Sequence, residues 1–145
     1  MIRWLQADEA EILVEGGMKF FAETGFPAPW NTDWFLGAVR AGIGSGDMRV
    51  AIREEDGKLA GAVGAIKSRS LFSHAPFWSK AFWNSFEDKR SSENLKLLEM
   101  IEGVARMERM PLVMSALENE HSDAMARLYR MRGYQPLERI HVKGA

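Results

Sequence analysis

Residues 124–143, which read A-M-A-R-L-Y-R-M-R-G-Y-Q-P-L-E-R-I-H-V-K, decide the fold of this chain. Their first half has the apolar spacing of an amphipathic helix and places Tyr129 near the C-terminal end of that helix. Gly133 is a typical helix-ending residue, because glycine adopts the left-handed backbone conformation without steric cost. Residues 135–143 have the pattern of a short strand, so we expect a helix that runs directly into a strand.

Composition limits the classes of protein that the sequence can encode. At 145 residues the chain is long enough for one domain with its own core, and we expect residues 1–145 to form that domain. The lack of cysteine excludes disulfides, thiolate metal sites and cysteine nucleophiles. The three histidines are scattered without the spacing of metal ligands, so no metal is expected.

Charge and hydropathy argue against nucleic acid and membrane as partners. The net charge is −1, which gives no broad attraction to nucleic acid or to anionic lipid. No apolar run approaches the length of a membrane span, and the N-terminus lacks the pattern of a signal peptide. We therefore expect a cytoplasmic protein with no membrane partner.

The rest of the chain alternates between strand and helix patterns. The clearest is a hairpin, in which residues 48–53 alternate, Asp56-Gly57 favours a turn with positive φ, and residues 59–66 continue as a strand. The other expected elements are a strand at residues 2–5, helices that begin at Asp8 and at residues 31–33, a strand at 80–86, a helix capped by Ser91 or Ser92 and ended by Pro111, and a central strand at 112–117 that is buried on both faces. The order β-α-α-β-β-β-α-β-α-β predicts an α/β domain with a mixed central sheet of about six strands.

The closing segment also carries a family resemblance. Leu128-Tyr129 and Gly133-Tyr134, followed by a short strand that ends in lysine, resemble the closing motif of the GNAT (Gcn5-related) N-acetyltransferases. The order of the elements is similar to the GNAT fold over nearly the whole chain, which implies a single-domain GNAT-like acyltransferase. The family commonly ends with two strands after the tyrosine helix. This chain has residues for one, as do short members of the family, many of them from phage genomes.

The resemblance implies a site for acetyl-CoA as cosubstrate. In the family a strand is followed by [Gln/Arg]-x-x-Gly-x-[Gly/Ala] and a long helix, whose N-terminal amides and dipole bind the pyrophosphate. Residues 89–94 align with this motif, with Lys89 in the basic position and with Ser92 and Asn94 where the family has glycine. The expected cofactor-binding residues, including those on the strand that would pair with the pantetheine arm, are Asn84, Phe86, Lys89, Arg90, Ser91, Ser92, Glu93, Asn94 and Leu95. The two serines also fit an ordinary helix cap that holds no ligand.

The resemblance implies that Tyr129 and Glu87 are the catalytic residues. A tyrosine held against the sulfur atom can give a proton to the departing thiolate of coenzyme A. The alternative for Tyr129 is a side chain that packs on the sheet and keeps its hydroxyl in water. Glu87 follows the 80–86 strand and is the expected general base, with Glu118, Glu120 or an ordered water as alternatives.

The leading hypothesis is an acyl-CoA-dependent N-acyltransferase that transfers an acetyl group to a primary amine of a small molecule or a peptide. Its acceptor contacts are expected from residues 26–32 and 68–79, which are rich in aromatic side chains. One alternative is a non-catalytic GNAT-like domain that binds CoA or a partner, which Ser92 and Asn94 in place of glycine favour. Another is a relative that modifies nucleic-acid bases, against which the lack of a basic surplus counts. A single last strand would leave an open sheet edge, which a homodimer could cover.

Overall fold

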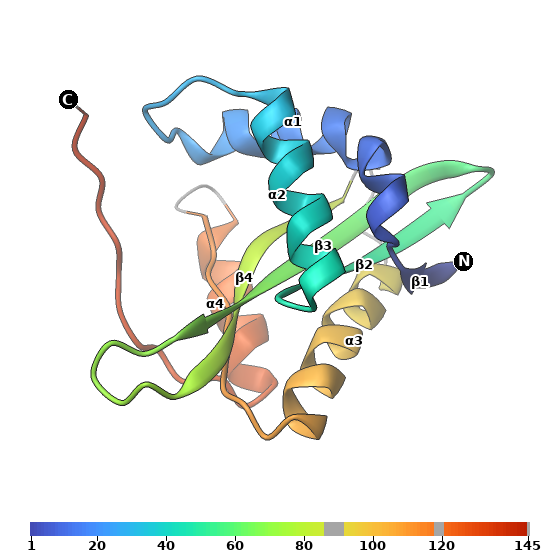
Figure 1. The fold of residues 1–145 in the computed structure, drawn as a ribbon. Coiled ribbons are helices and arrows are strands. Elements are labelled where there is room, and N and C mark those ends of the chain that lie inside the picture. The colour runs from blue at the N-terminus through green and yellow to red at the C-terminus, as the bar shows by residue number, and fades with distance from the viewer. Residues whose placement is uncertain (86–91, 118–120, 145) are drawn as a thin grey trace.

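The computed structural model describes residues 1–85, 92–117 and 121–144 of the chain, and Figure 1 labels its elements. In chain order these are β1 (Ile2–Trp4), a 3-10 helix (Ala7–Leu13), α1 (Val14–Thr24), α2 (Thr32–Ser45), β2 (Met48–Glu55), β3 (Lys58–Arg69), β4 (Pro76–Ser85), α3 (Glu93–Met107), β5 (Leu112–Val113) and α4 (Ser122–Met131). This order follows the sequence pattern up to the end of α4.

The strands form one five-stranded sheet in the order β1-β2-β3-β4-β5. Neighbours are antiparallel from β1 to β4, and β5 joins β4 in parallel, so the sheet is mixed as predicted. The β2–β3 hairpin turns at Asp56 and Gly57, whose φ angles are 51° and 75°. Both residues take the left-handed conformation that such a turn requires, which confirms the hairpin prediction.

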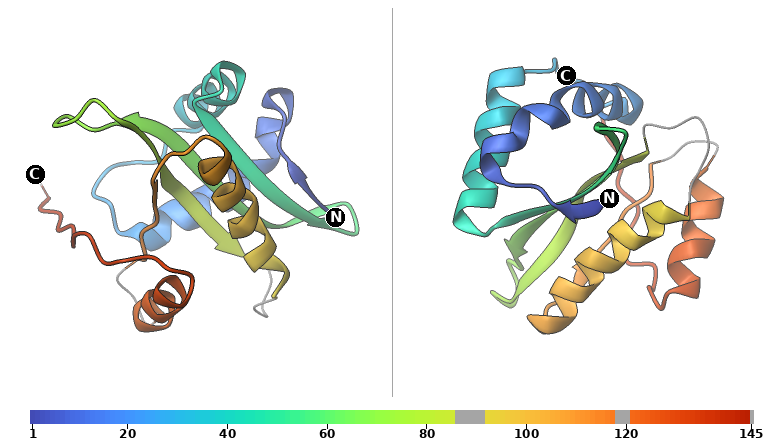
Figure 2. Two further views of the ribbon diagram at one scale, coloured as in Figure 1. Left: turned by 90° about the horizontal axis from the view of Figure 1, so that it is seen from below. Right: turned by 90° about the vertical axis from the view of Figure 1, so that its right-hand side faces the viewer.

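Helices cover both faces of the sheet, with α1 and α2 on one side and α3 and α4 on the other (Figure 2). The strands supply both cores because successive side chains point to opposite faces. On β2, Val50 and Ile52 pack in the core with Leu13 of the 3-10 helix and Val39 of α2, whereas Ala51 packs in the core with Leu97 of α3. The sheet is therefore the middle one of three layers. β5 lies at one edge of this sheet and pairs with β4 over only two residues.

The end of the chain differs from the sequence prediction. Residues 134–144 form no strand, so the sheet has five strands where about six were expected. A strand needs a neighbour that bonds its N–H and C=O groups, and Figure 1 shows this segment running away from the sheet. The apolar side chains of Leu137, Ile140 and Val142 are accordingly exposed rather than packed.

The strand expected at residues 112–117 is also shorter than predicted. Only Leu112 and Val113 pair with β4, and both are half-buried at the edge of the sheet rather than enclosed in its centre. An apolar run does not by itself distinguish a central strand from a segment that packs beneath helices. The early end of β5 has consequences for the site described below.

We predict that two glycines of α2 respond in opposite ways to alanine. A Cβ atom at Gly42 would lie 2.7 Å from Cβ of Met48, which is fixed to its own backbone, whereas a Cβ at Gly37 would meet nothing within 4 Å. Gly42→Ala should therefore lower the free energy of unfolding by about 1–3 kcal/mol through overpacking. Gly37→Ala, the matched control, should raise it by about 0.5–1 kcal/mol through helix propensity. Urea denaturation of both variants tests this, and equal effects would contradict the packing described for α2.

Candidate active site

β4 and β5 separate after only two residue pairs. Trp78 pairs with Leu112 and Ser79 with Val113, after which β4 continues beside β3 alone among the described strands. At the same point β4 carries a bulge, because Lys80 lies opposite Ala65 and Phe82 opposite Gly64, which leaves Ala81 unpaired. Bulges of this kind bend a strand and redirect its side chains, often next to active sites. We call the opening between β4 from Lys80 onward and residues 114–117 the splay.

Two side chains meet at one backbone oxygen in the splay. The hydroxyl of Tyr129 donates a hydrogen bond to the carbonyl oxygen of Ser115 at 3.0 Å, and Nζ of Lys80 donates to the same oxygen at 2.6 Å. A carbonyl oxygen has two lone pairs, so these two donors can satisfy it completely. The splay therefore brings a phenol from α4 and an amine from β4 to a common point.

Tyr129 is held in place by the turn that follows its own helix. Gly133 has a φ of 90°, and this left-handed residue lets the backbone N–H of Tyr134 reach the carbonyl oxygen of Tyr129 at 3.0 Å. The Tyr134 ring then lies 5.3 Å from the Tyr129 ring, and its hydroxyl donates to Glu102 of α3 at 2.9 Å. Arg132 forms an ion pair with the same carboxylate. The closing motif of the sequence thus fixes α4 against α3 and aims Tyr129 at the splay.

Burial shifts the acidity of both groups at Ser115. Tyr129 is 8% exposed and packs beside Trp83, and this burial raises the pKa of its phenol above the usual value. Tyr129 is therefore protonated at neutral pH, as a proton donor must be. Burial has the opposite sign for an amine and lowers the pKa of Lys80 to about 8.

The described part of the expected phosphate-binding segment is the start of α3. Of the two serines predicted to cap this helix, Ser92 stands at the N-cap position without a capping bond from its side chain, and Ser91 lies outside the described residues. Glu93 forms an ion pair with Lys96 at 3.0 Å, and Leu95 donates its N–H to the carbonyl oxygen of Ser92 at 3.1 Å. The exposed Ser92 hydroxyl remains available to a ligand at this helix end.

The side chain of Asn94 points inward, away from any site at the surface. Its Oδ1 accepts a hydrogen bond from Nε of Arg53 at 3.1 Å, and both side chains are buried, with 8% and 2% exposed. The absence of a side chain at Gly61 makes room for this contact, because a Cβ there would lie 2.6 Å from Oδ1 of Asn94. Any contact of Asn94 with a cofactor would have to come from its backbone.

Several predicted site residues lie outside the described residues. These are Phe86, Glu87, Lys89, Arg90 and Ser91, together with the alternative bases Glu118 and Glu120 and the side chain of Asn84. Their roles stay predictions. The structure brings together Tyr129 and the splay, and it places the start of α3 on the same side of the sheet as α4 (Figure 2).

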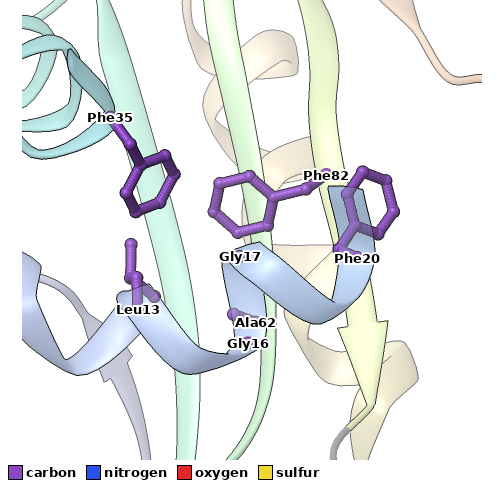
Figure 3. Close-up of a pocket in the computed structure, with 7 residues that line it drawn as sticks. All are labelled: Leu13, Gly16, Gly17, Phe20, Phe35, Ala62 and Phe82. Carbon is purple, nitrogen blue, oxygen red and sulfur yellow. The ribbon is translucent and has the colours of Figure 1, made fainter. Parts of the chain in front are cut away.

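A small apolar pocket lies on the opposite face of the sheet, between α1, α2 and the strands (Figure 3). Its lining residues are Leu13, Gly16, Gly17, Phe20, Phe35, Ala62 and Phe82. Phe20 links this pocket to the splay, because its ring lies 5.8 Å from Nζ of Lys80. Of the two segments expected to contact an acceptor, residues 26–32 include Trp30, which packs against Phe35. Residues 68–79 are a loop only in part, because β3 extends to Arg69 and β4 begins at Pro76.

Sequence reasoning missed Lys80 and Arg53. Lys80 is the one charged residue within the otherwise aromatic and small run from Pro76 to Ser85, which is an unusual composition for a strand near a core. Arg53 continues the inward register of Ala51 on β2. In both cases the signal is a charged residue at a strand position whose side chain, by the alternation of the strand, points inward.

The described residues contain no group of three His, Asp or Glu side chains that could hold a metal ion. None of the helices described is long and apolar enough to cross a membrane.

No family model and no curated protein matches the sequence. Solved structures do match, and they cover nearly the whole chain. A predicted acetyltransferase from Clostridium acetobutylicum, crystallised with acetyl-CoA, is 11% identical over 99% of this chain and 95% of that chain, with a TM-score of 0.77. The ribosomal-protein-alanine N-acetyltransferase from Brucella melitensis biovar Abortus 2308 is 13% identical over 99% and 98%, with a TM-score of 0.68. An aminoglycoside acetyltransferase from an uncultured soil metagenomic sample, in complex with sisomicin, is 12% identical over 100% and 95%, with a TM-score of 0.71.

These similarities define the fold. The chain has the fold of the GNAT acetyltransferases, which confirms the prediction made from the closing motif and the order of the elements.

We predict that Asn94 matters more for stability than Ser92 beside it. Asn94→Ala removes the amide oxygen that accepts from the buried guanidinium of Arg53, and this should cost about 1–3 kcal/mol of unfolding free energy. Ser92→Ala is the control, since this exposed side chain makes no capping bond, and it should change stability by less than about 0.5 kcal/mol. Thermal and urea denaturation measure both. Equal stability of the two variants would rule out a structural role for the Arg53–Asn94 pair.

Proposed function

We propose that this protein is an acyl-CoA-dependent N-acyltransferase that transfers an acetyl group to a primary amine. The observation that carries the proposal is the position of the Tyr129 hydroxyl, which lies inside the splay at the carbonyl of Ser115. A buried, protonated phenol at the point where two parallel strands part is suited to protonate a thiolate that leaves there.

The splay and the start of α3 fit the two halves of an acyl-CoA molecule. The pantetheine arm carries amide groups, and an extended chain with amides can add to the free edges of β4 and residues 114–117 as a strand would. The phosphates would lie at the N-terminus of α3, where Ser92 and the basic residues Lys89 and Arg90 are placed by the sequence. The Clostridium acetobutylicum protein of the same fold was crystallised with acetyl-CoA, which supports this choice of cosubstrate.

Acyl transfer to an amine has three requirements. The attacking amine must be neutral, the oxyanion of the tetrahedral intermediate needs a donor, and the departing sulfur needs a proton. Tyr129 supplies the proton, because a phenol is protonated at neutral pH and burial raises its pKa further. The bulge leaves Ala81 of β4 without a partner residue on β3, and a backbone N–H freed there would suit the oxyanion. Glu87 is retained as the general base.

The acceptor belongs to the class of primary amines on small molecules or peptides. Among proteins of the same fold, one is a ribosomal-protein-alanine N-acetyltransferase and another is an aminoglycoside acetyltransferase in complex with sisomicin. One of these proteins is named for a protein alanine and the other for an aminoglycoside, so together they represent both kinds of acceptor. An acceptor panel should therefore contain an aminoglycoside and a peptide with a free N-terminal alanine.

We also propose that two copies of the chain dimerise over the open β5 edge.

A second candidate is a domain of this fold that does not catalyse. The observation that favours it is Asn94, whose side chain occupies a glycine position of the phosphate-binding motif and is used for the buried contact with Arg53. Calorimetry with acetyl-CoA separates the two. We expect binding in the micromolar range, and no detectable heat at millimolar acetyl-CoA would favour the second candidate.

We predict that Tyr129→Phe keeps the affinity for acetyl-CoA but loses turnover. Removal of a general acid typically costs on the order of 10²–10⁴ in rate, and the loss should appear in kcat against the amines of the panel. Tyr134→Phe is the matched control, because its hydroxyl bonds Glu102 on α3 and lies outside the splay. This variant should retain most of its kcat. Unchanged turnover of Tyr129→Phe would remove this residue from the mechanism.

A further inference from the structure

Lys80 occupies a position in the splay that the proposed reaction leaves without a role. It is half-buried on β4 beside the bulge, its Nζ donates to the carbonyl of Ser115 at 2.6 Å, and the Phe20 ring lies 5.8 Å away. Among the described residues, no carboxylate forms an ion pair with it. The titratable group that shares its environment is the phenol of Tyr129, which bonds the same oxygen.

An amine that accepts an acyl group must meet two conditions. It must be neutral, so that its lone pair is free to attack, and it must lie beside the thioester on the side of the proton donor. Lys80 meets the second condition by geometry, since Nζ and the hydroxyl of Tyr129 converge on Ser115. It meets the condition of neutrality better than an ordinary lysine, because burial lowers its pKa from 10.5 to about 8. Its neutral fraction near neutral pH is then on the order of a hundredfold larger than that of an ordinary lysine.

We propose that Lys80 is itself an acyl acceptor, so that the protein acetylates this lysine from a bound acyl-CoA thioester when no other amine occupies the site. The inference rests on the proposed function, because it needs the thioester to lie in the splay. The neutral Nζ attacks the thioester carbonyl carbon and forms the N–C bond. The C–S bond breaks, Tyr129 gives its proton to the thiolate, and the extra proton on nitrogen returns through the phenol.

The modification removes the charge of Lys80 from the splay and replaces its ammonium donors with a single amide N–H. An acetylated Lys80 can no longer be protonated, and its added acetyl group occupies space next to Phe20 and the Ser115 carbonyl. We therefore expect the acetylated protein to transfer acetyl groups to external amines more slowly than the unmodified protein. Self-acetylation would limit the activity when acceptor is scarce and acyl-CoA is abundant.

The test is to incubate the purified full chain with acetyl-CoA alone and to follow acetylation by intact mass and peptide mapping. Lys96 serves as the internal control, because it is exposed and paired with Glu93. Lys80 should gain one acetyl group at least tenfold faster than Lys96, because only Lys80 lies at the splay beside Tyr129. Lys80→Arg should abolish this modification while it preserves a donor to Ser115, and Tyr129→Phe should slow it without changing the rate at Lys96.

Calorimetry with acetyl-CoA on the Lys80→Arg variant, which cannot be acetylated at this position, separates the possible failures. Acetyl-CoA that binds while Lys80 reacts no faster than Lys96 would overturn this proposal and leave the proposed function intact. An equal rate at Lys80 in the wild type and in Tyr129→Phe would also overturn it, because the reaction would then not use the site. If acetyl-CoA does not bind at all, the proposed function fails together with the inference.

Discussion

The early separation of β5 from β4 is the constraint on which the site depends. Once the parallel ladder ends after Ser79 and Val113, the backbone groups beyond it need other partners, because buried polar groups left unpaired are costly. The carbonyl of Ser115 finds two of them in Tyr129 and Lys80. An opening in the sheet, a buried phenol and a half-buried amine therefore occur together for one reason. An extended ligand that enters the sheet here would pair with backbone groups of β4 and residues 114–117 beyond the end of this ladder.

The position of Tyr129 follows from contacts at the other end of its helix. Gly133 ends α4 in the left-handed conformation and returns the chain to the Tyr129 carbonyl, while Tyr134 and Arg132 attach the turn to Glu102 of α3. The Gly-Tyr pair of the closing motif thus orients the helix that presents the tyrosine. This explains why the motif identifies the fold well. It would serve the same structural purpose in a domain of this fold without activity.

The sequence was sufficient for the order of elements through α4, the hairpin at Asp56-Gly57 and the GNAT fold, because these depend on local patterns and turn residues. It was not sufficient for the end of the chain. Residues 135–143 have strand character, but strand formation also depends on a neighbour, and no local pattern reports whether β5 offers one. The apolar run after Pro111 likewise has the composition of a central strand, but only Leu112 and Val113 pair with a neighbour.

The sequence predicts only part of the candidate site, because the rest depends on contacts that no local pattern shows. Tyr129 could be placed by its motif, whereas Lys80 and the Arg53–Asn94 pair arise from contacts between residues far apart in the sequence. Asn94 illustrates the difference well. The resemblance predicts that Asn94 belongs to a phosphate-binding turn, whereas its side chain points inward because Gly61 leaves space for it and Arg53 offers a donor. Alignment identified the position, and packing decided where the side chain points.

The most direct test of this account is a crystal structure of the protein with ethyl-CoA, a thioether analogue of acetyl-CoA that carries no acyl group to transfer. The account predicts that the pantetheine arm lies between β4 and residues 114–117, with the sulfur atom within hydrogen-bonding distance of the Tyr129 hydroxyl. A complex in which the analogue binds elsewhere, while Tyr129 and Lys80 both remain bonded to Ser115, would contradict it.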